Sequence, residues 1–104
     1  MPVQSTDVKA ANDATNAQDA TTQITALANA NDSLRAQNEA LSQQNSVLGQ
    51  QGNFEQIRAN NATIAQNNAI QAANGDQAFA LAGKYKLDIA TGTRVDGSTY
   101  IKLG

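Results

Sequence analysis

The sequence predicts a mainly α-helical, elongated fold, in which coiled-coil helices are interrupted near residues 49–53 and followed by a small C-terminal β-hairpin. Three observations carry this prediction. Residues 24–48 repeat their large apolar side chains every seven positions, glycines stand at positions 49 and 52, and the last twenty residues change to a two-residue alternation. A seven-residue period is typical of helices that wind around one another, and a two-residue period is typical of strands.

The composition excludes several classes of function. The chain of 104 residues has no cysteine and no histidine, which excludes disulfides, Cys/His metal sites and His-based catalysis. The net charge is −2 and no basic cluster is present, so we expect no nucleic-acid binding. No apolar run approaches the roughly 18 residues of a membrane span, and residues 1–20 lack the pattern of a signal peptide.

The apolar core is expected to be thin. Ala, Asn, Gln and Thr make up about half of the chain, and large apolar residues are few. Burying one Leu or Ile side chain contributes roughly 1.5–3 kcal/mol, and ordering each residue costs about as much. We therefore expect the folded state to need copies of itself or neighbouring proteins.

The first elements are an extended lead-in over residues 1–6 and a heptad helix over residues 7–48. Within the helix, one row of the heptad is purely Leu and the other is mostly Asn. We predict that these two rows form an oligomer core, consisting of Ile24, Leu27, Asn31, Leu34, Asn38, Leu41, Asn45 and Leu48.

The Asn row allows three interpretations. The first is a set of polar layers that fix the register of paired helices, because a buried Asn penalises misaligned or wrongly numbered assemblies. The second is a ring of amides around a trapped anion in a three-stranded rod. The third is a row that faces water. Asn at this heptad position is best known from parallel dimers, but so many Asn layers exceed what a dimer requires.

The stretch 49–53 breaks the heptad. A glycine after the last turn ends a helix readily through a left-handed residue, and Asn53 is a good cap for a following helix. The break is either a stutter in one long rod or the turn of a helical hairpin, and we favour the turn.

A second helical segment is expected over residues 54–83. Its core rows are predicted to contain Phe54, with Asn61 and Asn68, and Ile57 and Ile64, with Gln71. The pair Asn74–Gly75 predicts a helix end, followed by a short helix over 77–82.

A β-hairpin module is expected over residues 84–104. Tyr85, Leu87 and Ile89 alternate with polar or small residues, Asp96–Gly97 is a tight-turn signal, and 98–103 forms the returning strand. An isolated hairpin is only marginally stable in water, so this one should pack on its own helices or on copies of the chain. The residues predicted to dock it are Tyr85, Leu87, Ile89, Tyr100 and Ile101.

No constellation of residues indicates chemistry. We predict no catalytic, cofactor-binding or metal-binding residue and no cofactor, because no base, orienting partner or oxyanion loop is apparent. Arg35 has Asp32 and Glu39 at helical spacing and is expected to pair along its own helix. Asp96 precedes a glycine and is interpreted as a turn residue.

The overall plan resembles small virion proteins of tailed bacteriophages, particularly fibritin-like whiskers and fibres. The likeness rests on the heptads of 24–48, the glycine-interrupted break at 49–52, and the stretch Thr93–Leu103, which looks like a foldon-type hairpin. The resemblance implies a structural role in a virion, with the chain itself and other virion proteins as partners and the virion as its location. A cytoplasmic location is the expectation outside a virion.

We therefore expect a non-enzymatic structural or assembly protein, a fibre, spacer or plug component that oligomerises through its Leu/Asn heptads. The rival hypothesis is a coiled-coil adaptor or chaperone subunit that folds on a larger partner protein. A self-assembling fibre should be helical and oligomeric alone, whereas an adaptor that folds on its partner should be monomeric and poorly helical until mixed.

Overall fold

The computed structural model describes residues 16–104 and confirms the predicted fold class. Its elements are the helices α2 (Ala17–Gln50) and α3 (Phe54–Tyr85), followed by the strands β1 (Ile89–Thr93) and β2 (Thr99–Leu103). The predicted lead-in over 1–6 and the predicted helical residues 7–15 lie outside the described residues.

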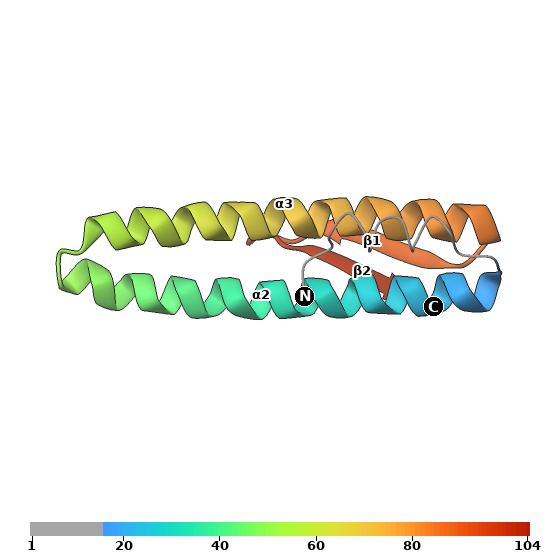
Figure 1. The fold of residues 1–104 in the computed structure, drawn as a ribbon, viewed down its shortest axis with the longest axis horizontal. Helices are drawn as coiled ribbons and strands as arrows, with labels where there is room; N and C mark the ends of the chain where they lie inside the picture. Colours follow the sequence, from blue (N-terminus) through green and yellow to red (C-terminus); the bar gives the residue numbers. More distant parts are fainter. Residues whose placement is uncertain (1–15) are drawn as a thin grey trace.

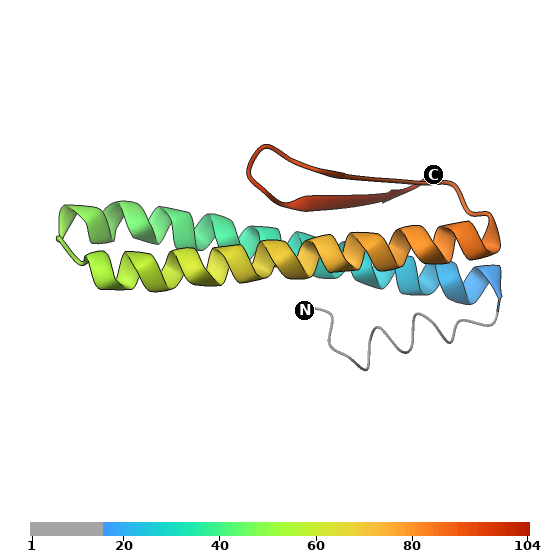
Figure 2. The ribbon, with the colours of Figure 1, turned by 90° about the horizontal axis from the view of Figure 1, so that it is seen from above.

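The two helices run side by side in opposite directions, so the break is the turn of a helical hairpin (Figure 1). The β-hairpin lies along one face of the helix pair and covers only the half that holds the start of α2 and the end of α3 (Figure 2). We call this covered part the proximal half, residues 17–38 and 67–85. The rest, residues 39–50 and 54–66, is the distal half.

Side-chain caps and a glycine define the ends of the helices. Asn16 accepts a hydrogen bond from the backbone N–H of Asp19 (2.8 Å) and begins α2. Gly52 adopts a left-handed backbone with φ of 72°, and the Asn53 side chain accepts from Gln56 N–H (3.3 Å) to begin α3. The predicted glycine turn and Asn53 cap are thus confirmed.

The predicted helix end at Asn74–Gly75 is wrong, because α3 continues through this pair without interruption. Gly75 is buried, and a Cβ built on it would lie only 2.9 Å from Cγ2 of Thr99 in β2. The glycine is therefore needed for close packing of the hairpin on the helix. A glycine suits both a helix end and a close packing contact, so the residue type alone does not distinguish the two roles.

The strand predicted to begin at Tyr85 begins at Ile89 instead. Tyr85 is the last residue of α3, and Lys86 follows as a left-handed C-cap with φ of 55°. Leu87 N–H then bonds back to the carbonyl of Ala82 (2.8 Å), which closes the helix end. The alternation from Tyr85 to Ile89 thus crosses a helix end, and Tyr85 continues the heptad row of Ile57 and Ile64.

The two strands pair antiparallel, with Ile89 opposite Leu103 and Thr93 opposite Thr99. The predicted Asp96–Gly97 turn connects them: Gly97 has φ of 88°, and its N–H donates to Arg94 O (3.0 Å). One face of the hairpin packs on the helices through Ile89, Ile101 and Leu103. Its other face carries the alternate residues of each strand.

The apolar core sits in the proximal half, between the helix pair and the hairpin. Its buried members are small or medium-sized, and half-buried side chains from the end of α3 and the hairpin pack against them. The buried members are Ala20, Ile24, Leu27, Ala78, Leu81 and Ala82. No other copy of the chain is needed to bury them, because α3 and the hairpin occupy the place that the sequence interpretation gave to further copies.

Candidate functional site

The seam between α2 and α3 carries three layers of paired asparagines. Asn74 donates to Asn31 Oδ1 (2.8 Å), Asn67 donates to Asn38 Oδ1 (2.9 Å), and Asn60 donates to Asn45 Oδ1 (2.9 Å). Each helix contributes one Asn every seven residues, so the layers fix the register of the antiparallel pair. The first interpretation of the Asn row, as a register-setting element, fits this arrangement.

A second set of polar residues repeats around two of these layers. Asn38 donates to Asn68 and Asn45 donates to Asn61, both at 3.0 Å, on the side of the seam that carries the hairpin. On the other side, Asn67 also donates to Gln37 and Asn60 also donates to Gln44, both at 3.0 Å. The motif is therefore a Gln-Asn pair on α2 facing an Asn-Asn pair on α3.

The third layer replaces this motif where the hairpin docks. Ala30 and Gly75 stand where the other layers have Gln and Asn. Asn31 donates to Thr99 O of β2 (3.1 Å) and to Gln71 O (3.2 Å), and Thr99 N–H donates to the Gln71 side chain (3.1 Å). The backbone of β2 thus takes the acceptor role that Asn61 and Asn68 have in the distal layers.

The predicted core residues fall into two groups. Those of the proximal half are buried within the single chain: Ile24, Leu27, Asn31, Leu34 and Asn38. Those of the distal half are half-buried: Leu41, Asn45, Leu48, Ile57 and Ile64. Their assignment to a core between copies stays a prediction, and in this closed helical hairpin only the distal group is open to a partner.

Phe54 is 63% exposed and does not share a buried row with Asn61 and Asn68. The buried polar row of α3 is Asn60, Asn67 and Asn74 instead. Phe54 lies at the end of the rod beside the turn, so it belongs to no core of the single chain.

The predicted docking residues of the hairpin are all half-buried, but they do not all face the helices. Tyr85, Leu87, Ile89 and Ile101 pack against the core. Tyr100 pairs with Gly92, on the face opposite to that of Ile101. Its ring covers Gly92, where an added Cβ would come within 2.6 Å, and the Arg94 guanidinium stacks 5.6 Å from the ring centre.

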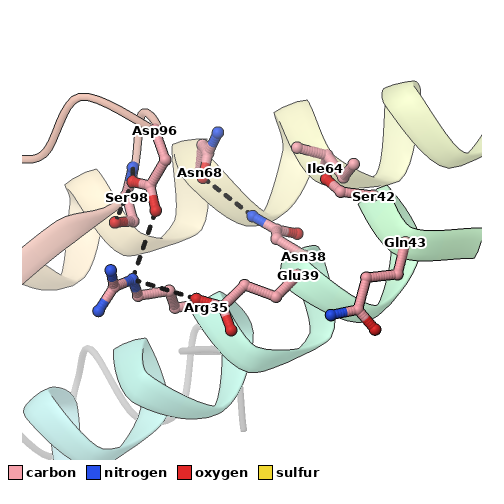
Figure 3. Close-up of a pocket in the computed structure, with 9 residues that line it drawn as sticks. All are labelled: Arg35, Asn38, Glu39, Ser42, Gln43, Ile64, Asn68, Asp96 and Ser98. Carbon is pink, nitrogen blue, oxygen red and sulfur yellow. Dashed lines mark hydrogen bonds and ion pairs between the residues drawn. The ribbon is translucent and has the colours of Figure 1, made fainter. Parts of the chain in front are cut away.

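A polar cleft of about 240 Å³ opens between the hairpin tip and the helices (Figure 3). Arg35 lies at its edge between Asp96 (3.3 Å) and Glu39 (3.8 Å), so the predicted pairing along the helix is joined by a pairing across the fold. Hydrogen bonds from the Ser98 hydroxyl and backbone N–H, together with Arg35, lower the pKa of Asp96 below its ordinary value. These contacts attach the hairpin tip to α2.

The polar lining of the cleft consists of one cluster of paired charges and neutral polar groups. It combines one arginine with two carboxylates that pair with it, and the remaining polar groups are amides and hydroxyls. Over residues 16–104, no cluster of three or more acidic side chains is placed to hold a metal ion. Each of the six amide nitrogens of the Asn layers donates at least one hydrogen bond to a protein oxygen, and the trapped-anion interpretation stays a prediction.

Several residues that build the seam were missed by the sequence interpretation. They are Asn60, Asn67, Asn74, Ser98 and Thr99, all buried, whereas the predicted core-row residue Gln71 is buried as expected. The seven-residue spacing of Asn60, Asn67, Asn74 and Leu81 was a usable signal, because it repeats the spacing on α2. For Ser98 and Thr99 no local signal exists, since their burial depends on where the hairpin docks.

Comparisons with protein-family models, curated proteins and solved structures gave no match to this chain. In the described part of the chain, neither helix combines the length and apolar character that crossing a membrane requires.

Proposed function

We propose that this chain is a non-enzymatic assembly protein, in which the closed proximal half is a rigid base and the distal half associates with other chains. The supporting observation is the difference in burial along one heptad pattern. Leu27 and Leu34 are buried, whereas Leu41 and Leu48 are half-buried. The change coincides with the end of the β-hairpin cover (Figure 2).

The distal half exposes two large apolar side chains, and the proximal half exposes Phe79 of α3 at 64%. Val47 is 53% exposed and Phe54 is 63% exposed, and both lie near the turn between the helices. A two-helix layer without a third element leaves one side of its apolar row open to water, which favours association with a further helix or helix pair. Two distal halves packed together would form a four-helix bundle.

The partner is proposed to be a second copy, so that the chain oligomerises through its distal heptads as a spacer, fibre or plug. The attribution to a phage virion rests on the resemblance to fibritin-like proteins. In this chain the hairpin docks on its own helices, so the proposed assembly uses the distal helices in place of a hairpin trimer.

The test measures the mass of the full chain by light scattering over a range of concentrations. We expect an oligomer whose population falls in a Val47→Ser/Phe54→Ser variant, because the variant removes exposed apolar surface while leaving the Asn layers intact. The matched control is Val95→Ser, which polarises a side chain that is fully exposed at the hairpin tip, on the proximal side. A mass that is insensitive to the distal substitutions would contradict the proposal.

The adaptor hypothesis is the second candidate, and one observation favours it. The proximal layers are buried within a single chain, so the rod has a closed core without self-association. A chain that is monomeric at every concentration, yet strongly helical by circular dichroism, would favour an adaptor that binds another protein through the same distal surface.

A further inference from the structure

The outer edge of β1 is an unprotected strand edge in the described structure. Arg94 N–H donates to Ser98 O (2.7 Å) and Gly104 N–H donates to Asp88 O (3.1 Å), so the even-numbered residues of β1 bond to β2. The N–H and C=O groups of Ile89, Thr91 and Thr93 therefore point away from β2. Among residues 16–104 they have no hydrogen-bond partner in the structure.

The two edges of the hairpin differ. The β2 edge is bonded to the helices at Thr99, through Asn31 and Gln71. The β1 edge reads Ile-Ala-Thr-Gly-Thr and contains none of the charges or prolines that usually protect a free edge. A groove of about 130 Å³ lies between the hairpin and α3, and its lining comprises Thr91, Gly92 and Thr93 of β1, Thr99 of β2, and Ala72, Gly75 and Asp76 of α3.

We propose that β1 pairs with β1 of a second copy, antiparallel and centred on Thr91, to form a four-stranded sheet in the order β2-β1-β1-β2. In this register Thr91 faces its own copy and Ile89 faces Thr93. All three residues present their backbone groups to the partner, so the pairing satisfies the open edge of both chains. The arrangement is a two-fold interface, in which each chain supplies the same surface.

Charge complementarity selects this occupant and this register. Counting outward from Thr91, Asp88 of one chain lies opposite Arg94 of the other, and the symmetry repeats the pair. Asp88 and Arg94 share the outer face of the sheet with Ala90 and Gly92, so opposing side chains meet on one face. Within residues 16–104 neither Asp88 nor Arg94 belongs to an ion pair, and the Arg94 guanidinium donates to the Ser98 hydroxyl (3.3 Å) and stacks on Tyr100.

The proposed dimer is closed. Each β1 edge is used once and each β2 edge is bonded to its own helices at Thr99, so the two-fold pairing through β1 adds no third copy. The interface lies at the proximal half, at the opposite end from the exposed Val47 and Phe54, and it is tested independently of the distal association.

The experiment is a charge exchange in the full chain carrying Val47→Ser and Phe54→Ser, which removes the proposed distal association. Sedimentation velocity should show a monomer–dimer equilibrium for this background. Asp88→Arg alone and Arg94→Asp alone should each weaken dimerisation at least about tenfold, because each places like charges opposite each other twice. An equimolar mixture of the two variants should restore the dimer, since every cross-chain pair is again Asp opposite Arg.

A second measurement follows the backbone amides of the β1 edge by hydrogen exchange. The amide protons of Ile89, Thr91 and Thr93 should exchange more slowly with solvent at high protein concentration than at low concentration. A background chain that stays monomeric, or a dimer indifferent to both charge reversals and to their mixture, would overturn the proposal. If the mass falls on introducing Val47→Ser and Phe54→Ser and no dimer of this background remains, the distal association is supported and the pairing of β1 is overturned.

Discussion

Burying an asparagine amide costs free energy unless its polar atoms are hydrogen-bonded, and Asn31 makes three such bonds. It donates to Gln71 O and Thr99 O and accepts from Asn74. Removing one partner of a buried hydrogen bond costs about 1–3 kcal/mol for each group left unpaired. Asn31 therefore joins both helices and the hairpin at one point.

Asn31→Ala is expected to lower the free energy of unfolding by about 2–4 kcal/mol, because Thr99 O and Asn74 Nδ2 are left unpaired in the core. Asn45→Ala is the matched control. It removes the same atoms from a half-buried layer, where water replaces the lost partners, and should cost no more than about 1 kcal/mol. Urea unfolding of both variants measures the difference, and equal losses would contradict the account.

Asp96 gives a pH-dependent contribution to stability. Its pKa is lower in the folded chain than in the unfolded chain, mainly through the Ser98 hydroxyl and backbone N–H and also through Arg35. Its stabilising contribution is thus complete above the unfolded pKa and is lost as the pH falls through the folded pKa. Ser98→Ala should raise the pKa of Asp96 toward the ordinary value, which an NMR titration of the carboxyl carbon reports. An unchanged titration would refute the assignment.

At the scale of the elements, two glycines of α3 have different roles. Gly75 lies against Thr99 of β2, whereas a Cβ on Gly83 would meet nothing within 4 Å. Alanine in an open helical position stabilises a helix by roughly 0.5–1 kcal/mol relative to glycine. Alanine at Gly75 gains the same helix propensity, but its Cβ would clash with Cγ2 of Thr99 in β2.

Gly83→Ala should therefore raise the melting temperature, and Gly75→Ala should lower it while loosening the hairpin. Amide hydrogen exchange checks the second part: the strand protons of β1 and β2 should lose protection in Gly75→Ala and keep it in Gly83→Ala. If the hairpin is equally protected in both variants, the contact between Gly75 and Thr99 does not hold it.

The elements show how far the sequence could be interpreted. The Leu row, the Gly52–Asn53 turn and the Asp96–Gly97 turn follow from local signals and were predicted. The continuation of α3 past Gly75 was not predicted. That glycine is required by its close contact with Thr99, which lies twenty-four residues later in the chain. The single-chain closure of Ile24 and Leu27 was also missed, because a heptad pattern does not tell whether its partner helix is another copy or the same chain folded back.

At the scale of the whole molecule, the seam behaves as a repeat that can be shortened. Each Gln-Asn pair on α2 faces an Asn-Asn pair on α3, and the two layers of this kind are separated by one heptad along each helix. Deleting residues 38–44 together with 61–67 removes one heptad from each helix and joins Gln37 to Asn45 and Asn60 to Asn68, so both motifs are preserved. Deleting 38–44 alone shifts α2 against α3 by a heptad.

The paired deletion should leave a folded rod that is shorter by about 10 Å, since each helical residue adds about 1.5 Å. The single deletion should be far less stable, because the distal turn no longer meets both helix ends. Small-angle scattering measures the length and thermal unfolding measures the stability. Equal stability of the two deletions would contradict a register fixed by the Asn layers.

The central claim is that one chain closes its own heptad rows, and a spin-label distance tests it most directly. The chain has no cysteine, so Ala26→Cys/Ala80→Cys places two labels at exposed sites on α2 and α3 without competition. The account predicts a short distance, of about 10–20 Å from helix packing, that persists when labelled protein is diluted with unlabelled protein. A separation near 80 Å, as in one continuous helix at about 1.5 Å per residue, would contradict it, as would a short distance that vanishes on dilution.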